Sequence, residues 1–221
     1  MDAVSIIALS MGAAWASGIN LYATIFMLGY MGMTGNIVLP EELQVLSNPM
    51  VMTAAGFMYC VEFFADKIPG VDSGWDSLHT FIRIPAGAML AASAVGDVTP
   101  AVELTAAILG GALAAGSHTT KAGSRLLINT SPEPVSNWGA SITEDLLVIG
   151  GLWAALNHPV LFLMALVLFI ILMIWLLPRL WRLFKVIFRR IGSWLGLCEP
   201  PPPAEPKPST DEQTRITKDS S

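Results

Sequence analysis

Ionisable side chains stand at helical spacing in segments of the chain that are otherwise apolar. Glu62 and Asp66 are four residues apart, and His118, Lys121 and Arg125 follow at steps of three and four, so each group occupies one helix face. Carboxylates in such places can bind a cation or relay protons, and Lys or Arg can hold an anionic group. The candidate binding residues are Glu62, Asp66, Asp72, Asp76, His79, Arg83, His118, Lys121, Arg125, Glu144 and Asp145.

The histidines point to a second kind of chemistry. Imidazole suits Zn²⁺ and carboxylate oxygens suit Mg²⁺ or Mn²⁺, so His79, His118 and Asp76 are candidate metal ligands. The string GSHTTKAGSR at 116–125 has a weak similarity to membrane lipid phosphatases. Those enzymes need a further His and Asp downstream, and the next histidine is His158, in a loop predicted on the opposite side. A metal-dependent enzyme therefore ranks below a non-enzymatic role.

The composition indicates that lipid, not water, surrounds most of the chain. Its 221 residues are 53% hydrophobic and 13% charged, with a mean hydropathy of +0.60, whereas soluble domains carry about 25% charged residues. Residues 1–178 hold four basic and twelve acidic residues. This balance excludes nucleic-acid binding, which needs a basic surface. Cys60 and Cys198 stand far apart, so neither a disulfide framework nor a CxxC metal site is expected.

Apolar runs predict an all-α polytopic membrane bundle of about six transmembrane helices. A helix of about 20 apolar residues crosses a bilayer. The first run is longer than one crossing needs, so tilt or a break near Gly18 is expected. Three runs reach crossing length only with a charged flank, or else some of them are re-entrant, and their Gly and Ala let helices approach closely. The predicted spans are 5–32, 49–64, 77–96, 101–121, 138–157 and 159–177.

Basic residues set the predicted orientation. Five of the 12 fall between Arg179 and Arg190, just after the last span, which places the C-terminus in the cytoplasm. Six crossings then place the N-terminus there too. Asp2, with no Lys or Arg in the first segment, argues against a cleaved signal peptide.

The region after the last span has two parts. Residues 179–198 alternate basic and apolar side chains at helical spacing, which predicts an amphipathic helix on the inner membrane face, attracted to anionic lipid. The alternative is that the last span simply continues. Residues 199–221, with four consecutive prolines and mixed charge, predict a disordered cytoplasmic tail that a cytoplasmic partner could bind. Residues 1–178 form the transmembrane domain.

Alternation of the helices brings the polar segments together. The second and fourth predicted helices carry their charges at the C-terminal end, and the third and fifth at the N-terminal end, so all four groups meet on the cytoplasmic side. A charged cavity there is expected, because ionisable groups in lipid are costly unless they pair or face water. The alternative is a set of ion pairs that only holds the bundle together. The loops 67–76 and 129–138 share prolines and a Trp, which indicates a degenerate helical-hairpin repeat.

Three segments resemble a known family. SGINLYA at 17–23, EFFADKIPGVDSGWDSLHTFIRIPAGA at 62–88, and GSHTTKAGSRLLINTSPEPVSNW at 116–138 with Glu144 and Asp145 are similar to the domain of unknown function 4126 family of bacterial membrane proteins. The resemblance implies a multi-pass protein of the bacterial inner membrane. It implies no activity, substrate or cofactor.

These features together favour a small transporter or channel-like protein for an ion, a polar solute or a lipid head group. A charged cavity and an interrupted first helix both fit transport. The alternatives are a membrane-embedded metal-dependent enzyme acting on a lipid phosphate, and a non-catalytic scaffold whose tail recruits a partner. The sequence indicates neither a cofactor nor an oligomeric state.

Overall fold

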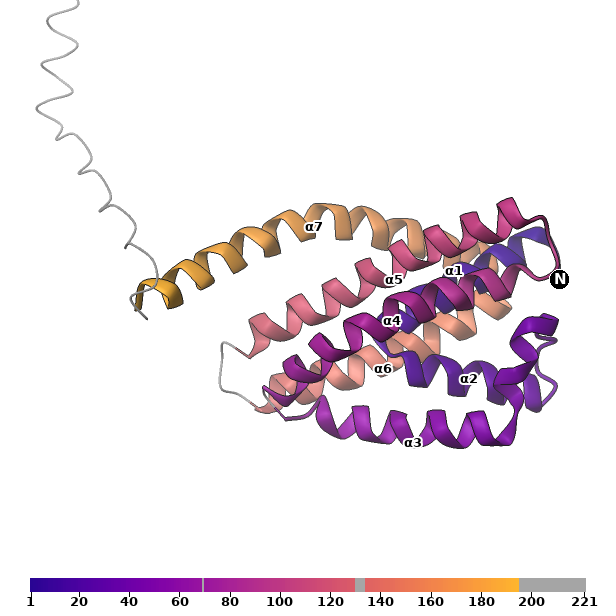
Figure 1. The fold of residues 1–221 in the computed structure, drawn as a ribbon, viewed down its shortest axis with the longest axis horizontal. Coiled ribbons are helices and arrows are strands. Elements are labelled where there is room, and N and C mark those ends of the chain that lie inside the picture. The colour runs from indigo at the N-terminus through magenta and orange to yellow at the C-terminus, as the bar shows by residue number, and fades with distance from the viewer. Residues whose placement is uncertain (69, 130–133, 195–221) are drawn as a thin grey trace, which may run out of the picture. The chain divides into compact units, whose positions relative to one another are not determined.

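The computed structural model describes residues 1–68, 70–129 and 134–194, and every regular element among them is helical (Figure 1). Residues Met1–Leu177 form one compact unit, and the chain from Pro178 belongs to a second. The elements are α1 (Ala3–Ile19), α2 (Leu21–Met33), the 3₁₀ helix η1 (Glu41–Ser47), α3 (Pro49–Ala65), α4 (Val71–Val95), α5 (Pro100–Ile128), α6 (Pro134–Asn157) and α7 (Pro159–Trp194).

The first predicted span consists of two helices. Asn20 has an extended backbone conformation, with φ −146° and ψ 98°, and it both ends α1 and begins α2. Its side chain accepts a hydrogen bond from the Ala23 N–H at 2.9 Å, which is a favourable N-cap. The chain therefore breaks just after Gly18, and the break is built by a polar residue that satisfies the freed backbone groups.

α2 returns along the bundle and does not continue the course of α1. Met1 lies beside Leu39 and Gly96 in one surface pocket, and Gly32, near the end of α2, packs against the same Leu39. Both ends of the α1–α2 hairpin therefore lie at one end of the unit (Figure 1). Of the two alternatives for residues 5–32, tilt or a break near Gly18, the break is confirmed. The reversal of the chain there was not predicted, because hydropathy measures the length of an apolar run and not the direction of the chain.

The hairpin also changes the position of the N-terminus. Met1 lies beside Gly96, which ends α4, whereas Asp76 and the other polar residues of that helix lie near its start. The N-terminus and the polar residues are thus at opposite ends of the unit. The assignment of the N-terminus to the cytoplasm depended on six crossings, and the hairpin removes that basis.

The helices from α3 to the first half of α7 run in alternating directions, as predicted (Figure 1). Among the described residues, four helical stretches are long and apolar enough to cross a membrane, and α3 is a shorter apolar helix. α4 begins at Val71 and α5 ends at Ile128, so both extend further into the polar flanks than the predicted bounds 77–96 and 101–121. The charged side chains in those flanks are buried against protein, which is why the helices continue through them.

Glycine and other small residues bring α1, α4 and α5 into close contact. A Cβ atom at Gly87 of α4 would collide with the side chains of Ala114 on α5 and Ser17 on α1, and one at Gly18 of α1 would collide with α5. Such positions let helix backbones approach closely where lipid supplies no hydrophobic drive for association. The close approach expected from the Gly- and Ala-rich sequence is confirmed.

α7 begins at Pro159 and contains a second proline, Pro178, at the boundary between the two units. Phe162 and Leu166 bury its first turns in the core of the first unit, next to Trp15. The helix extends to Trp194, so most of the predicted segment 179–198 is helical. Its place on the membrane surface stays a prediction, and the predicted tail at 199–221 lies outside the described residues.

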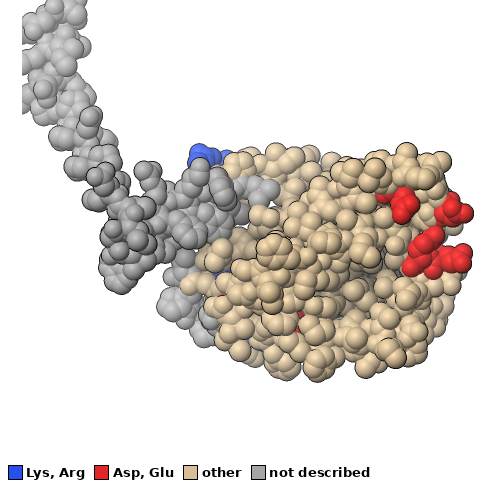
Figure 2. Space-filling model, in the orientation of Figure 1, with Lys and Arg blue, Asp and Glu red and all other residues tan. Residues whose placement is uncertain are grey.

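Exposed carboxylates gather at the end of the first unit that holds Met1 (Figure 2). The rest of the face in view shows almost no charge, as a lipid-facing surface requires. The exposed acidic residues at this end are Asp2, Glu41, Glu42, Asp97 and Glu103.

Candidate functional site

Seven of the predicted residues form one connected ion-pair network inside the first unit. They come from four helices and lie at the end of the bundle away from Met1. Their side chains are buried, with the largest exposed fraction, 13%, at Glu144. The members are Glu62 on α3, Asp66 just after it, Asp76 and Arg83 on α4, Lys121 and Arg125 on α5, and Glu144 on α6.

Lys121 lies at the centre of the network. Its ammonium nitrogen is 3.3 Å from a carboxylate oxygen of Glu62, 3.0 Å from Asp66, 3.7 Å from Asp76 and 3.5 Å from Glu144. These four carboxylates come from three other helices and from the turn after α3. One positive charge thus holds together groups that would otherwise repel one another.

Arg83 is completely buried and pairs with two of the same carboxylates. Its guanidinium donates to Glu62 and to Asp76, the latter at 3.1 Å. The same nitrogen that contacts Asp76 is 3.2 Å from Nδ1 of His118, and Nε2 of that ring is 2.7 Å from the hydroxyl of Thr80. Arg83 therefore joins α3, α4 and α5.

Arg125 binds α6 and the turn after α3 at the same time. Its guanidinium donates two hydrogen bonds to Glu144, at 2.9 and 2.7 Å, in the planar paired geometry that arginine favours. The third nitrogen donates to the backbone carbonyl oxygens of Asp66 at 2.9 Å and Asn137 at 3.2 Å. These bonds fix the start of α6 to the end of α3.

The two predicted histidine ligands lie in different surroundings. His79 stacks on Trp75, with ring centroids 4.3 Å apart, and its Nε2 is 3.1 Å from the hydroxyl of Tyr22. His118 and Asp76 both contact Arg83 instead. The described part of the chain contains no group of three or more His, Cys, Asp or Glu side chains that could hold a metal ion. These residues therefore do not form a common metal site there.

Asp72 and Asp145 are buried but lie outside the network. Both oxygens of Asp72 accept hydrogen bonds from the amide of Asn129 at 2.9 Å, which joins the start of α4 to the end of α5. Asp145 accepts a hydrogen bond from the amide of Asn20 at 3.1 Å. The tip of the α1–α2 hairpin is therefore held by the first half of α6.

The network contains four carboxylates and three bases. Its net charge is therefore −1 when every member is ionised. Oε2 of Glu62, Oδ1 of Asp66 and Oδ2 of Asp76 are buried without a hydrogen-bond partner among the described residues. In each case the other oxygen of the same carboxylate lies against Lys121. Such oxygens cost about 1–3 kcal/mol each, and more when charged.

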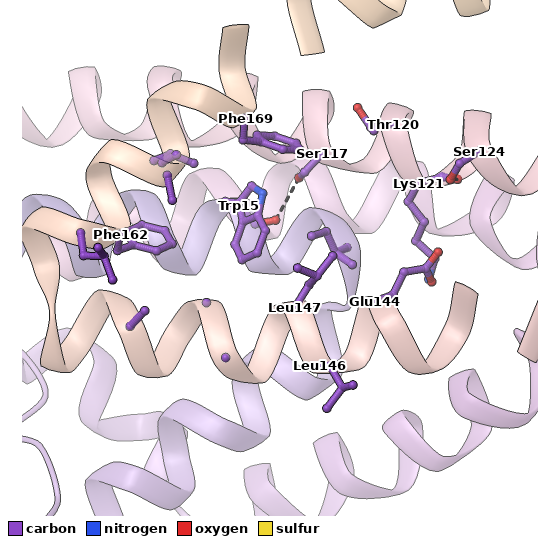
Figure 3. Close-up of a pocket in the computed structure, with 17 residues that line it drawn as sticks. Trp15, Ser117, Thr120, Lys121, Ser124, Glu144, Leu146, Leu147, Phe162 and Phe169 are labelled. Atoms are coloured by element: carbon purple, nitrogen blue, oxygen red, sulfur yellow. Dashed lines mark hydrogen bonds and ion pairs between the residues drawn. The ribbon is translucent and has the colours of Figure 1, made fainter. Parts of the chain in front are cut away.

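A pocket of about 470 Å³ reaches the edge of the network from the apolar side of the bundle (Figure 3). Lys121 and Glu144 lie at one end, with Trp15 in the middle and Phe162 toward the other end. Its walls come from α1, α5, α6 and the first turns of α7, all within Met1–Leu177. The network is therefore closed to water on most sides but has one largely apolar approach.

Several polar partners of the site carry no charge and were therefore not predicted from the sequence. Asn20, Asn129 and Asn137 are asparagines at helix ends, where capping is the ordinary explanation. Tyr22 lies in an apolar run. One signal was present in the sequence: Asn20 is the most polar residue of a long apolar run, and a polar residue at that depth normally has a partner.

The fold and the network together define a polytopic α-helical membrane protein with a buried ionic centre. The family described as a domain of unknown function, DUF4126, matches residues 7–179, and the chain belongs to this family. Comparisons with curated proteins and with solved structures gave no match.

Proposed function

We propose that this protein is a proton-coupled membrane transporter in which the ion-pair network is the proton-binding site. The observation that carries the proposal is the buried excess of one negative charge, together with three carboxylate oxygens that lack a hydrogen-bond partner among the described residues. Ionisable groups inside a membrane protein commonly mark ion pathways and proton relays. A proton suits the geometry better than a metal ion, since the described residues offer no group of three metal ligands.

The α1–α2 hairpin supports transport as the use of this site. Transporters commonly place their sites at the ends of interrupted helices, where backbone groups are free to face a ligand. Here the interruption at Asn20 contacts Asp145, the residue that follows network member Glu144 on α6. A movement of the hairpin tip would therefore displace Asp145 and, with it, the neighbouring network residue Glu144.

The proposed orientation places the network end in the cytoplasm of a bacterial cell and Met1 outside. The four basic residues before Pro178 all lie at the network end, and the exposed carboxylates lie at the other. We expect a cysteine at Asp2, in a chain with Cys60→Ser and Cys198→Ser, to react with an impermeant maleimide added to intact cells. A cysteine at Ser136 serves as the inside control. Protection of the Asp2 cysteine in intact cells, with labelling after lysis, would contradict this orientation.

The decisive experiment measures charge movement in proteoliposomes on a solid-supported membrane. A pH jump should produce a transient current with the wild-type protein, because protons enter the network. Glu62→Gln should reduce this current to that of protein-free liposomes, since it removes a fully buried carboxylate of the site. Glu103→Gln makes the same change at an exposed position at the opposite end and should leave the current unchanged. A sodium jump at constant pH should give no current.

Two results would overturn the proposal. One is a wild-type current no larger than that of empty liposomes. The other is a current in Glu62→Gln that equals wild type while the variant keeps its thermal stability in detergent. The second result would leave the network a purely structural device.

No described contact favours the other two hypotheses to the same degree. A metal-dependent enzyme would need His79, His118 and carboxylates around one position, and they have separate partners. The scaffold hypothesis depends on residues 199–221, which lie outside the described part of the chain. Deleting that tail should therefore leave the pH-jump current intact.

A further inference from the structure

The pocket in Figure 3 is amphipathic along its length. Its walls are formed largely by aliphatic and aromatic side chains and by the small residues Gly150 and Gly151 of α6. The polar end holds Lys121, Glu144 and the hydroxyl groups of Thr120 and Ser124, whereas Ser117 lies beside Trp15 in the middle of the pocket (Figure 3). This gradient, from apolar at one end to ionic at the other, matches a lipid molecule.

Hydrogen-bond acceptors dominate the polar end and continue to Ser117 in the middle. The hydroxyl of Ser117 donates to the carbonyl oxygen of Trp15 at 2.9 Å, that of Thr120 to Gly116 at 2.9 Å, and that of Ser124 to Lys121 at 2.7 Å. Each hydroxyl donates its hydrogen bond to a backbone carbonyl oxygen, so only its oxygen lone pairs remain for a ligand.

Charge at the polar end agrees with this pattern. Glu144 is the most exposed of the four network carboxylates. The ammonium of Lys121 is already engaged by carboxylates, two of them at hydrogen-bond distance. A ligand group placed here would therefore have to be a donor, and preferably a cation.

The middle of the pocket is lined by Trp15. Trp15 is 8% exposed, lines the pocket, and has an indole N–H without a hydrogen-bond partner among the described residues. A buried Trp N–H normally finds an acceptor. Its ring is held edge-on between Phe162 and Phe169, with centroids 6.0 Å away in both cases. The indole nitrogen itself is covered, so the Trp15 ring contributes apolar surface to the middle of the pocket.

We infer that the pocket binds an amine-headed phospholipid of the phosphatidylethanolamine class. The ammonium faces Glu144 and the hydroxyl oxygens, and an acyl chain lies along the apolar wall past Trp15. An anionic head group would add a second negative charge beside a network that already has one in excess. The inference rests on the proposed function, because it makes this lipid the substrate of the same site.

The test is titration of the full-length protein in detergent with ethanolamine, choline and glycerol phospholipids of identical acyl chains, followed by native mass spectrometry. Phosphatidylethanolamine should bind tightest, the choline lipid more weakly because its head lacks N–H donors, and phosphatidylglycerol weakest. Gly150→Phe should weaken ethanolamine-lipid binding by about tenfold or more, because a Cβ there meets open space and the ring fills the pocket.

Gly139→Phe is the matched control. Gly139 lies on the same helix, is exposed, has open space at its Cβ and does not line the pocket. Its lipid affinities should equal wild type. Equal binding of all three lipids without a response to Gly150→Phe would mean annular lipid only, and it would overturn the inference. Tighter binding of phosphatidylglycerol would overturn it as well.

The pH-jump current separates this inference from the proposed function. A normal current without selective lipid binding would overturn the inference of a bound lipid and would still support the proton site. Selective binding that responds to Gly150→Phe, with no wild-type current, supports the pocket assignment and removes proton coupling.

Discussion

Lys121→Met should lower the free energy of unfolding by about 3–5 kcal/mol, the loss typical of breaking a buried ion pair by removing one partner. Met fills nearly the same volume, so packing changes little. The substitution removes the cation at the centre of four carboxylates. In three of these carboxylates, the oxygen that does not contact Lys121 has no hydrogen-bond partner among the described residues. The remaining bases, Arg83 and Arg125, cannot balance them.

Unfolding in mixed micelles, followed by tryptophan fluorescence, would measure this loss. Lys67→Met is the comparison, because Lys67 is also largely buried but contacts the Phe63 ring, the carbonyl oxygen of that residue and the hydroxyl of Ser141. Its loss should be about 1 kcal/mol. Adding Glu62→Gln to Lys121→Met should restore part of the stability, since it removes one uncompensated charge. Equal losses at the two lysines, or no recovery in the double variant, would show that the charges are not coupled.

Helical spacing and the alternation of the helices are both visible in the sequence, and they predicted that these ionisable side chains lie at one end of the bundle. Spacing of three and four places Lys121 and Arg125 on one helix face, and antiparallel packing brings that face to Glu62 and Asp76 whatever the details of the loops. Burial of charge in lipid then demands pairing. Neither spacing nor pairing depends on exact helix bounds or side-chain rotamers. The side chains therefore meet even though α4 begins six residues before its predicted start and α5 ends seven residues after its predicted end.

The hairpin could not be predicted in the same way. An apolar run of this length is compatible with one tilted helix or with two short helices, and composition does not distinguish them. The difference lies in long-range contacts: Asn20 with Asp145, and the end of α2 with the segment around Leu39. The first contact joins residues 125 positions apart, and the second depends on the direction in which the chain leaves α2, so neither can be recognised from the local sequence. The position of the N-terminus depended on this choice alone.

Arg125→Met should also lower the free energy of unfolding by about 3–5 kcal/mol. Arg125→Lys should lower the free energy of unfolding by about 2–3 kcal/mol. Lysine keeps the charge but has a single nitrogen. It cannot make the paired hydrogen bonds to Glu144 and also reach the carbonyl oxygens of Asp66 and Asn137. At least one buried acceptor is left unpaired in either variant, and each costs about 1–3 kcal/mol.

The comparison of the two variants decides what the guanidinium contributes. If charge alone stabilised the network, Arg125→Lys would behave as wild type. If geometry matters, the lysine variant should lie between wild type and Arg125→Met in stability. Because Arg125 fixes α6 to the turn after α3, the loosened variant should also show a smaller pH-jump current, since Glu144 and Asp66 no longer face Lys121 at fixed distances. A full current with reduced stability would show that Arg125 only holds the helices together and that the proton site does not depend on it.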